Sequence, residues 1–248
     1  MKKNENVVEV RDLTVVYDRV PVVWNVDIEI TKGHLVGIIG PNGAGKTTLL
    51  KALLGLTESV SGEVSFFGDS YGNVRKRVAY VPQRDSVDWD FPTTVYDVVM
   101  MGRYTEMRFW QRPGDEDHNV VKRALKNVGI EDLAERRISE LSGGQKQRVF
   151  LARAMAQQAE LYLLDEPYAG IDVATEKTIS DILKDLVSKG KTVVVVHHDL
   201  STVKEYFDSV IMLNVRKVAS GSVEEVFVRG NLEKLYGGSL PFMDNLKI

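Results

Sequence analysis

Residues 40–47, Gly-Pro-Asn-Gly-Ala-Gly-Lys-Thr, constrain the fold of this 248-residue chain more than any other feature. They follow an apolar run at 35–39 and precede a helical run at 48–54, which is the strand–loop–helix setting of a G-x-x-x-x-G-K-[ST] loop. In such a loop the backbone N–H groups curl around phosphate oxygens, and the helix N-terminus adds a positive dipole. Lys46 should reach the terminal phosphates, and the Thr47 hydroxyl can ligate Mg²⁺. The predicted phosphate contacts are Gly40, Pro41, Asn42, Gly43, Ala44, Gly45, Lys46, Thr47 and Thr48.

Three further apolar runs, at 78–81, 161–164 and 193–196, share the character of the run at 35–39. Strands that are apolar throughout are covered on both faces, as in a parallel sheet flanked by helices. A helix is expected at 173–188, where apolar residues recur at helical spacing and a glycine follows the end. We therefore predict an α/β fold with the RecA-like parallel-sheet core of a P-loop NTPase.

The first part of the chain indicates a different kind of sheet. Apolar and polar residues alternate along 7–30, which is typical of half-buried antiparallel strands. Residues 8–17 form one strand of the expected pair, and 63–67 supply another short strand. The residues expected to share the inward face of the second strand are Trp24, Val26, Ile28 and Ile30. We predict an N-terminal antiparallel β subdomain.

Helical periodicity replaces the strand signal between 95 and 155, which predicts an inserted α-helical subdomain. Nearer the C-terminus, Ser222 and Glu225 have the spacing of a capping box, so a helix should begin at 223. We expect one domain over 1–248. Residues 1–94 hold the β subdomain and the first part of the core, 95–155 the helical subdomain, 156–228 the rest of the core and 229–248 a tail.

Composition excludes several classes of function. The formal net charge of -3 provides no global positive field, so nucleic acid is not expected as the main partner. The absence of cysteine excludes disulfides, thiol catalysis and cysteine-containing metal sites. The N-terminal ten residues lack the apolar core of a secretory signal, and no run of about 18 apolar residues occurs. We expect the protein to stay inside the cell, with any membrane association peripheral.

Polar side chains follow the predicted parallel strands. Asp165 and Glu166 come directly after the run at 161–164; Asp165 is placed to hold the Mg²⁺ shell, and Glu166 to polarise a water against the terminal phosphate. The alternative is a pair of acids at a helix N-terminus. Gln83 follows the run at 78–81, and His197 and His198 end the run at 193–196. Open α/β sheets bind ligands at these strand ends, so the agreement in position favours one common site.

Residues 141–145, Leu-Ser-Gly-Gly-Gln, open a helix that continues through Met155. Ser142 is a good N-cap, and the glycines Gly143 and Gly144 leave the amide edge open to an anion. The alternative from the residues alone is an ordinary capped helix with a flexible entry.

Taken in order and spacing, these strings resemble the nucleotide-binding subunit of an ATP-binding-cassette (ABC) transporter over about residues 7–225. The segments at 82–92, 97–104 and 207–214 further resemble the ATPases of manganese, zinc or iron importers. The resemblance implies ATP hydrolysis with Mg²⁺ that drives import of a divalent transition metal through a separate membrane permease. Another substrate, an exporter or a non-transport ABC clamp are the alternatives.

The resemblance also implies partners and places. Two copies should pair head to tail as a homodimer on the cytoplasmic face of the membrane, next to permease subunits that an extracytoplasmic metal-binding protein supplies. The segment from Ser142 to Gln145 of one copy should close over the phosphates held by the other. The implied roles are adenine stacking for Tyr17, contact with Mg²⁺ or water for Gln83, a hold on the terminal phosphate for His198, and a dimer contact for Asp172. Packing within the small sheet is the alternative for Tyr17.

Trp89 and Phe91 lie in the segment 85–92, where acids and a proline predict an exposed loop. Exposed aromatic side chains in such a loop suggest docking to the permease. The alternative is that both rings pin the loop to the helical subdomain. The string at 108–112, Arg-Phe-Trp-Gln-Arg, is compatible with contact to a membrane protein or lipid head groups and equally with an exposed loop anchored by its aromatics.

Overall fold

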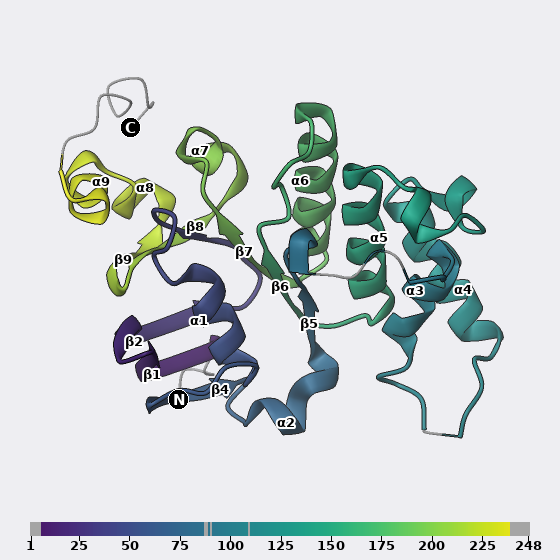
Figure 1. Ribbon diagram of the computed structural model, residues 1–248, viewed down its shortest axis with the longest axis horizontal. Coiled ribbons are helices and arrows are strands. Elements are labelled where there is room, and N and C mark those ends of the chain that lie inside the picture. Colours follow the sequence, from purple (N-terminus) through teal and green to yellow (C-terminus); the bar gives the residue numbers. More distant parts are fainter. Residues whose placement is uncertain (1–5, 87–88, 90, 109, 239–248) are drawn as a thin grey trace.

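The computed structural model describes residues 6–86, 89, 91–108 and 110–238, and Figure 1 shows their arrangement. Two sheets lie at one end and the middle of the elongated molecule, and the helices of the predicted helical subdomain gather at the other end. The two sheets follow the sequence pattern: the runs that are apolar throughout form the central sheet, and the alternating runs form the smaller one.

The central sheet has six strands in the order β5-β6-β7-β3-β8-β9. Its first five strands are parallel, and the edge strand β9 pairs antiparallel with β8. The strands are β3 (Leu35–Ile39), β5 (Val78–Val81), β6 (Leu161–Asp165), β7 (Thr192–His197), β8 (Ser209–Asn214) and β9 (Arg216–Ser222). All residues of β3, β6 and β7 are buried, which confirms the predicted parallel core.

The smaller sheet has the order β2-β1-β4 and is antiparallel, as predicted. Its strands are β1 (Asn6–Tyr17), β2 (Val20–Thr31) and β4 (Ser61–Phe66). The prediction for Trp24 was wrong: Val23 is buried instead, and Trp24 is 42% exposed. Asn25 has a positive φ of 48°, and the pairing register shifts between Val26 and Val23, so the bulge reverses the alternation there.

Helix α1 (Lys46–Leu53) lies between the two sheets, where its leucines pack with residues of β1, β2 and one face of the central sheet. Helix α6 (Val173–Ser188) covers the other face and has the predicted bounds. The remaining core elements are α2 (Tyr71–Val74), η1 (Arg75–Arg77), η2 (Arg84–Ser86), η6 (Leu200–Thr202), α7 (Val203–Tyr206), α8 (Val223–Val226) and α9 (Arg229–Tyr236). Helix α8 begins at Val223 as predicted, but the capping box predicted at Ser222 is wrong, because the Ser222 side chain makes no capping hydrogen bond.

The described part of 95–155 is helical and adds no strand to either sheet, as predicted. It contains α3 (Val95–Met100), η3 (Met101–Arg103), α4 (Asp115–Asn127), η4 (Glu131–Leu133), η5 (Ile138–Glu140) and α5 (Gly143–Ala156). The side chains of α3, α4 and α5 share one apolar core with α6 and a face of the central sheet. The helical subdomain is therefore continuous with the core on this side.

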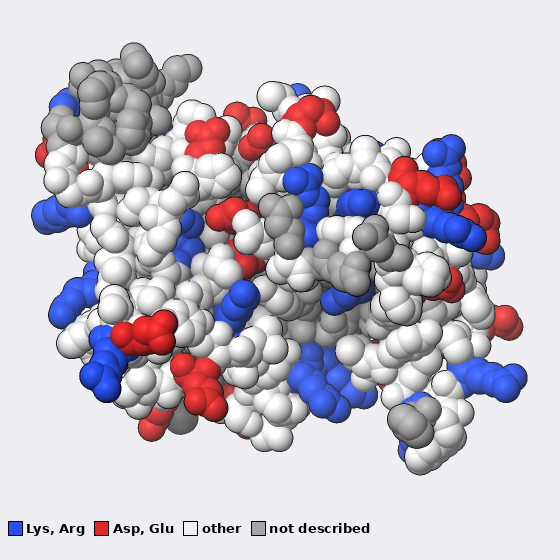
Figure 2. All heavy atoms as spheres, viewed as in Figure 1, with Lys and Arg blue, Asp and Glu red and all other residues white. Residues whose placement is uncertain are grey.

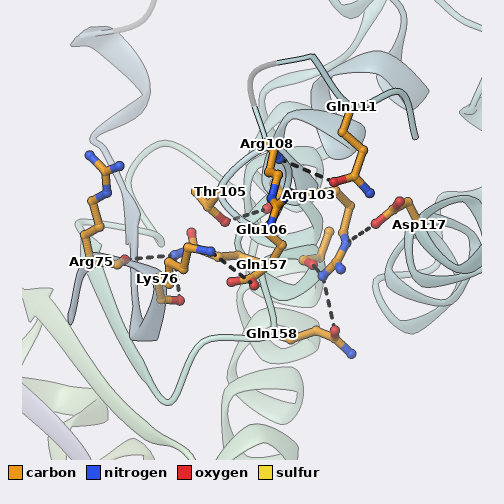
Figure 3. Close-up of polar contacts among 12 residues, drawn as sticks. Arg75, Lys76, Arg103, Thr105, Glu106, Arg108, Gln111, Asp117, Gln157 and Gln158 are labelled. Carbon is orange, nitrogen blue, oxygen red and sulfur yellow. Dashed lines mark hydrogen bonds and ion pairs between the residues drawn. The ribbon is translucent and has the colours of Figure 1, made fainter. Parts of the chain in front are cut away.

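A buried arginine in η3 joins the start of α4 to the C-terminal end of α5 (Figure 3). Arg103, only 7% exposed, donates from Nε to Oδ1 of Asp117 at 3.0 Å and from Nη1 to the Ala156 carbonyl at 2.9 Å. Its Nη1 also lies 3.1 Å from Oε1 of Gln158. Next along the chain, the Gln157 amide donates to the carbonyls of Arg75, Lys76 and Val78. These bonds fix the end of α5 against the start of β5.

None of the helices in the described ranges is both long and apolar enough to cross a membrane. On the face shown in Figure 2, basic and acidic side chains are interspersed rather than gathered into one large patch of a single sign.

Candidate nucleotide site

A pocket of about 390 Å³ lies at the carboxyl ends of the central strands, between the loop after β3 and the residues that follow β5 and β6. Its described lining consists of Val22, Asn42, Gly43, Ala44, Gly45, Lys46, Thr47, Thr48, Gln83 and Glu166. The structure thus brings the predicted phosphate loop together with two of the predicted strand-end residues. Val22 carried no signal in the sequence, because its place in the lining depends on how β2 packs beside the loop.

Two glycines make the shape of the loop possible. Gly45 has φ +89°, and a Cβ there would overlap the Val22 carbonyl. Gly40 lies so close to the Leu213 carbonyl that a Cβ would overlap this backbone atom as well. Neither obstacle is a flexible side chain, so both positions require glycine. The loop therefore approaches the neighbouring strands closely and turns directly into α1.

Lys46 is buried, and its ammonium group contacts the phosphate loop itself. Its Nζ donates to the carbonyls of Gly40 at 2.9 Å and Pro41 at 2.8 Å. Burial lowers the pKa of the Lys46 ammonium, while the carboxylates of Glu166 and Asp165 act in the opposite direction. A polyphosphate would add negative charge beside this ammonium, so the loop is suited to an anion.

Asp165 ends β6 next to the loop. The Thr47 hydroxyl donates to its Oδ1 at 2.8 Å, whereas its Oδ2 is buried and has no hydrogen-bond partner among the described residues. Burial raises the pKa of this carboxyl, and the charge of Glu166 adds to the effect. An unpaired buried carboxylate oxygen beside a threonine hydroxyl is a donor set that fits Mg²⁺. The described ranges contain no group of three or more His, Cys, Asp or Glu side chains that could hold a metal ion, so protein ligands for Mg²⁺ here would have to include Thr47 or Gln83 beside Asp165.

Gln83 and Glu166 meet across the pocket. The Gln83 amide donates from Nε2 to Oε2 of Glu166 at 3.0 Å. Glu166 has φ 49°, a left-handed backbone that is strained for a residue with a side chain. In this conformation the Glu166 side chain lines the pocket and accepts the hydrogen bond from Gln83. A carboxylate held here can act as a general base for a water that approaches the terminal phosphate.

The two histidines at the end of β7 lie in different surroundings. His197 is 2% exposed among Tyr168, Tyr206 and Phe207, and its Nε2 lies 2.8 Å from the Thr202 hydroxyl. Burial lowers its pKa to about 4, so it is neutral at pH 7. His198 is exposed. His197 is therefore a packing residue, and His198 is the one open to a ligand.

Ser142 caps α5 as predicted. Its hydroxyl accepts from the Gln145 N–H at 3.3 Å, and the Gln145 side chain accepts from the Ser142 N–H at 2.9 Å. The cap sets the turn that carries Gly143 and Gly144. Neither this turn nor Tyr17 or His198 belongs to the described lining of the pocket in the same chain.

The other predicted contact residues lie on the surface. Tyr17, at the end of β1, is 45% exposed, and its hydroxyl lies 3.2 Å from that of Thr57. Asp172 caps α6: it accepts from the Thr175 N–H at 3.0 Å, and this bond lowers the pKa of its carboxyl. Phe91 is 61% exposed, as expected for its loop.

Trp89 was also expected to be exposed, but it is half-buried. Its ring packs edge-on against Phe150 of α5 at 4.9 Å, and its Nε1 donates to the Arg84 carbonyl at 2.8 Å. The large apolar ring finds a helix surface close by, which accounts for the difference. The sequence analysis did not single out Arg84, although the structure places its guanidinium beside both Gly143 and Gly170.

A family model described as "ABC transporter" matches residues 23–169. The chain belongs to this family. It is an ATP-binding domain of the ABC type, and thus an ATPase coupled to transport. The family match agrees with the strand order, with the phosphate loop and with the residues gathered around it.

Curated relatives match almost the whole length of this ABC subunit. It is 52% identical over 236 residues to the manganese transport system ATP-binding protein MntB of Bacillus subtilis, covering 95% of this chain and 94% of the relative. It is 54% identical over 233 residues to the zinc transport system ATP-binding protein TroB of Treponema pallidum, covering 94% and 88%. A solved inward-facing putative metal-chelate type ABC transporter superposes with a TM-score of 0.82 at 30% identity, covering 93% and 88%.

Proposed function

We propose that this ABC subunit hydrolyses Mg-ATP in a head-to-tail homodimer and so drives import of a divalent transition metal, manganese, zinc or iron, through a separate permease. The chemistry rests above all on one observation, the buried and unpaired Oδ2 of Asp165 beside the Thr47 hydroxyl and the phosphate loop. The cargo rests on relatives of about 50% identity that are named for manganese and zinc transport.

In this proposal each residue of the site has one task. The Lys46 ammonium leaves its hydrogen bonds to the two loop carbonyls and donates to oxygens of the terminal phosphates instead. Thr47, Asp165 and Gln83 would hold Mg²⁺, which supplies charge neutralisation for the phosphates when bound. Glu166 takes the proton of the attacking water, and the exposed His198 contacts the terminal phosphate. The 3.0 Å bond from Gln83 to Glu166 keeps the carboxylate at the pocket until the nucleotide arrives.

The shared site accounts for residues that a single chain leaves apart. Ser142 is exposed, and neither it nor the turn that follows belongs to the described lining of the pocket in its own chain. A helix N-terminus with two glycines is suited to an anion. We propose that the segment from Ser142 to Gln145 contacts the phosphates held by the second copy, that Asp172 lies at the dimer contact, and that Tyr17 stacks on adenine.

Mixing two inactive variants tests the shared site. Ser142→Arg disables one half of each site and Lys46→Ala the other, so a mixed dimer has one intact site and one that carries both defects. We expect ATP-dependent dimerisation and hydrolysis to recover in part on mixing, and each variant alone to stay inactive. Absence of recovery in dimers that a tag shows to be mixed would contradict a site built from two chains.

Uptake by cells tests the cargo. Cells that lack this chain should take up less of one of the three metals, and the wild-type chain but not Lys46→Ala should restore uptake. The proposed place of the subunit is the cytoplasmic face, bound to permease subunits that receive the metal from an extracytoplasmic binding protein. Unchanged uptake of manganese, zinc and iron would contradict metal import and favour another substrate or an exporter.

A further inference from the structure

Arg84 stands directly after Gln83 and opens the turn η2. The two neighbouring side chains leave the chain in different directions. Gln83 reaches Glu166, whereas the guanidinium of Arg84 lies against the turn that begins α5 and the loop that follows Glu166. The strand end of β5 therefore contacts both the catalytic carboxylate and the Ser142–Gln145 segment within one chain.

The guanidinium sits between two glycines. Its Nη1 donates a long hydrogen bond of 3.4 Å to the Gly170 carbonyl, and its Nη2 lies 2.9 Å from the place that a Cβ of Gly170 would take. A Cβ at Gly143 would overlap Nη1. Because the guanidinium is the flexible end of the side chain, Gly143→Ala would displace Arg84 rather than the backbone. Both glycines thus leave room for Arg84.

The backbone of Arg84 is attached to α5 as well. Its carbonyl accepts from Nε1 of Trp89 at 2.8 Å, and Trp89 packs on Phe150. The Lys146 ammonium lies 5.1 Å from the centre of the Trp89 ring, at cation–π distance. Arg84 therefore contacts α5 through its side chain at the first turn and through Trp89 one to two turns later.

We propose that Arg84 is a positioning residue: it fixes the N-terminus of α5 relative to the Glu166 loop, so that a displacement of Gln83 carries the Ser142–Gln145 segment with it. The inference rests on the proposed shared site, in which that segment serves the second copy. Arg84 needs no contact with nucleotide for this role. Its loss should therefore misplace the segment without weakening the binding of ATP to a single chain.

Amide hydrogen exchange in the nucleotide-free chain tests the positioning role. In Arg84→Ala, the amides of 145–150 should exchange at least about fivefold faster than in the wild type, because the start of α5 loses a support. Arg84→Lys keeps the positive charge and a single donor nitrogen, so its exchange rates should lie between those of the wild type and Arg84→Ala. Arg75→Ala is the matched control, since the Arg75 guanidinium points away from the other labelled residues in Figure 3. The proposal would be overturned if exchange in Arg84→Ala were unchanged from the wild type. It would also be overturned if Arg75→Ala accelerated exchange as much as Arg84→Ala does.

A double variant separates positioning from a general loss of stability. If Gly143→Ala acts by displacing Arg84, it should accelerate exchange in the wild-type background and add little to Arg84→Ala, so the two effects are non-additive. Additive effects would overturn the proposed contact. This readout uses a nucleotide-free single chain, so it stands even if the mixing experiment rejects the shared site.

Kinetics give the functional half of the test. Arg84→Ala should lower kcat for ATP hydrolysis by at least about tenfold, because small misplacements of a catalytic segment are costly. The Kd of the single chain for ATP should stay within about twofold. A normal kcat despite faster exchange at α5 would overturn the link from position to activity, and so would a loss confined to ATP affinity.

Discussion

The Thr47 hydroxyl donates a 2.8 Å hydrogen bond to Oδ1 of Asp165, while Oδ2 of the same carboxylate is buried without a partner among the described residues. Burial raises the pKa of this carboxyl, which means that its charged form is disfavoured in the nucleotide-free chain. A cation at Oδ2 would compensate for the lost hydration. The unpaired carboxylate at the end of β6 thus lowers the stability of the free protein, but it is suited to a metal-bound substrate.

Asp165→Asn should separate stability from binding. Without nucleotide, the free energy of unfolding should stay the same or rise by about 1 kcal/mol, because a buried unpaired charge is removed. In the wild type, Mg-ATP at about 100 times its Kd should add about 2.7 kcal/mol, and the variant should lose most of this gain. Urea unfolding with and without Mg-ATP measures both quantities. Asp181→Asn, on the exposed side of α6, serves as the control, and a full gain from Mg-ATP in Asp165→Asn would contradict the assigned metal contact.

The buried His197 should make stability depend on pH. Its pKa is lowered to about 4 in the folded chain, against about 6.5 when unfolded, so the unfolded state binds the extra proton between these values. Its contribution is complete above pH 6.5 and is lost as the pH falls toward 4, at up to about 1.4 kcal/mol per pH unit. Urea unfolding from pH 7.5 to 5 should show a shallower decline in His197→Gln than in the wild type. Parallel curves would contradict a neutral buried His197.

The Arg103 junction should be costly to break. Arg103→Met leaves Asp117 without its buried partner and frees the Ala156 carbonyl, so we expect a loss of about 3 kcal/mol in the free energy of unfolding. Lys76→Ala removes an exposed pair with Glu106 at 3.7 Å and should cost less than about 1 kcal/mol. Chemical denaturation of the two variants compares them directly. Similar small losses would show that the Arg103 pair stabilises no more than a surface pair.

Alanine substitution of Trp89 and of Phe91 should have different effects. Phe91→Ala should leave the unfolding midpoint unchanged and weaken association with the permease by more than about 2 kcal/mol, because this ring is exposed. Trp89→Ala should cost about 2 kcal/mol of stability first, because the ring packs on Phe150. Thermal unfolding and co-purification with the permease measure the two effects. A Phe91→Ala variant that keeps full permease affinity would remove this residue from the docking surface.

The sequence was sufficient to predict features that depend on residues close to one another along the chain. The phosphate loop, the Asp165–Glu166 pair and the cap at Ser142 are each contiguous or three residues apart, so their spacing is visible without a structure. Contacts between distant segments were not visible in this way. Arg84 and Gly170 are 86 positions apart, and nothing near either one marks the contact.

Local irregularities limited the prediction in other places. The reversed alternation at Trp24 depends on the bulge at Asn25, and an asparagine that adopts a positive φ has no distinct pattern in a strand. The spacing at Ser222 marks the start of α8 correctly, but spacing does not determine whether the Ser222 side chain turns toward the amides of the first turn. The half-buried state of Trp89 depends on Phe150, which approaches only in the folded helical subdomain.

Hydrolysis by Glu166→Gln is the most direct test of the central claim, that Glu166 activates water at a phosphate site closed by a second copy. The substitution keeps the shape of the side chain and an oxygen that can accept from Gln83, but removes the base. We predict a fall in the single-turnover rate by about 10²–10⁴ with ATP affinity retained, and accumulation of an ATP-bound dimer in size-exclusion chromatography. Hydrolysis near the wild-type rate, or a variant that stays monomeric with bound ATP, would contradict the account.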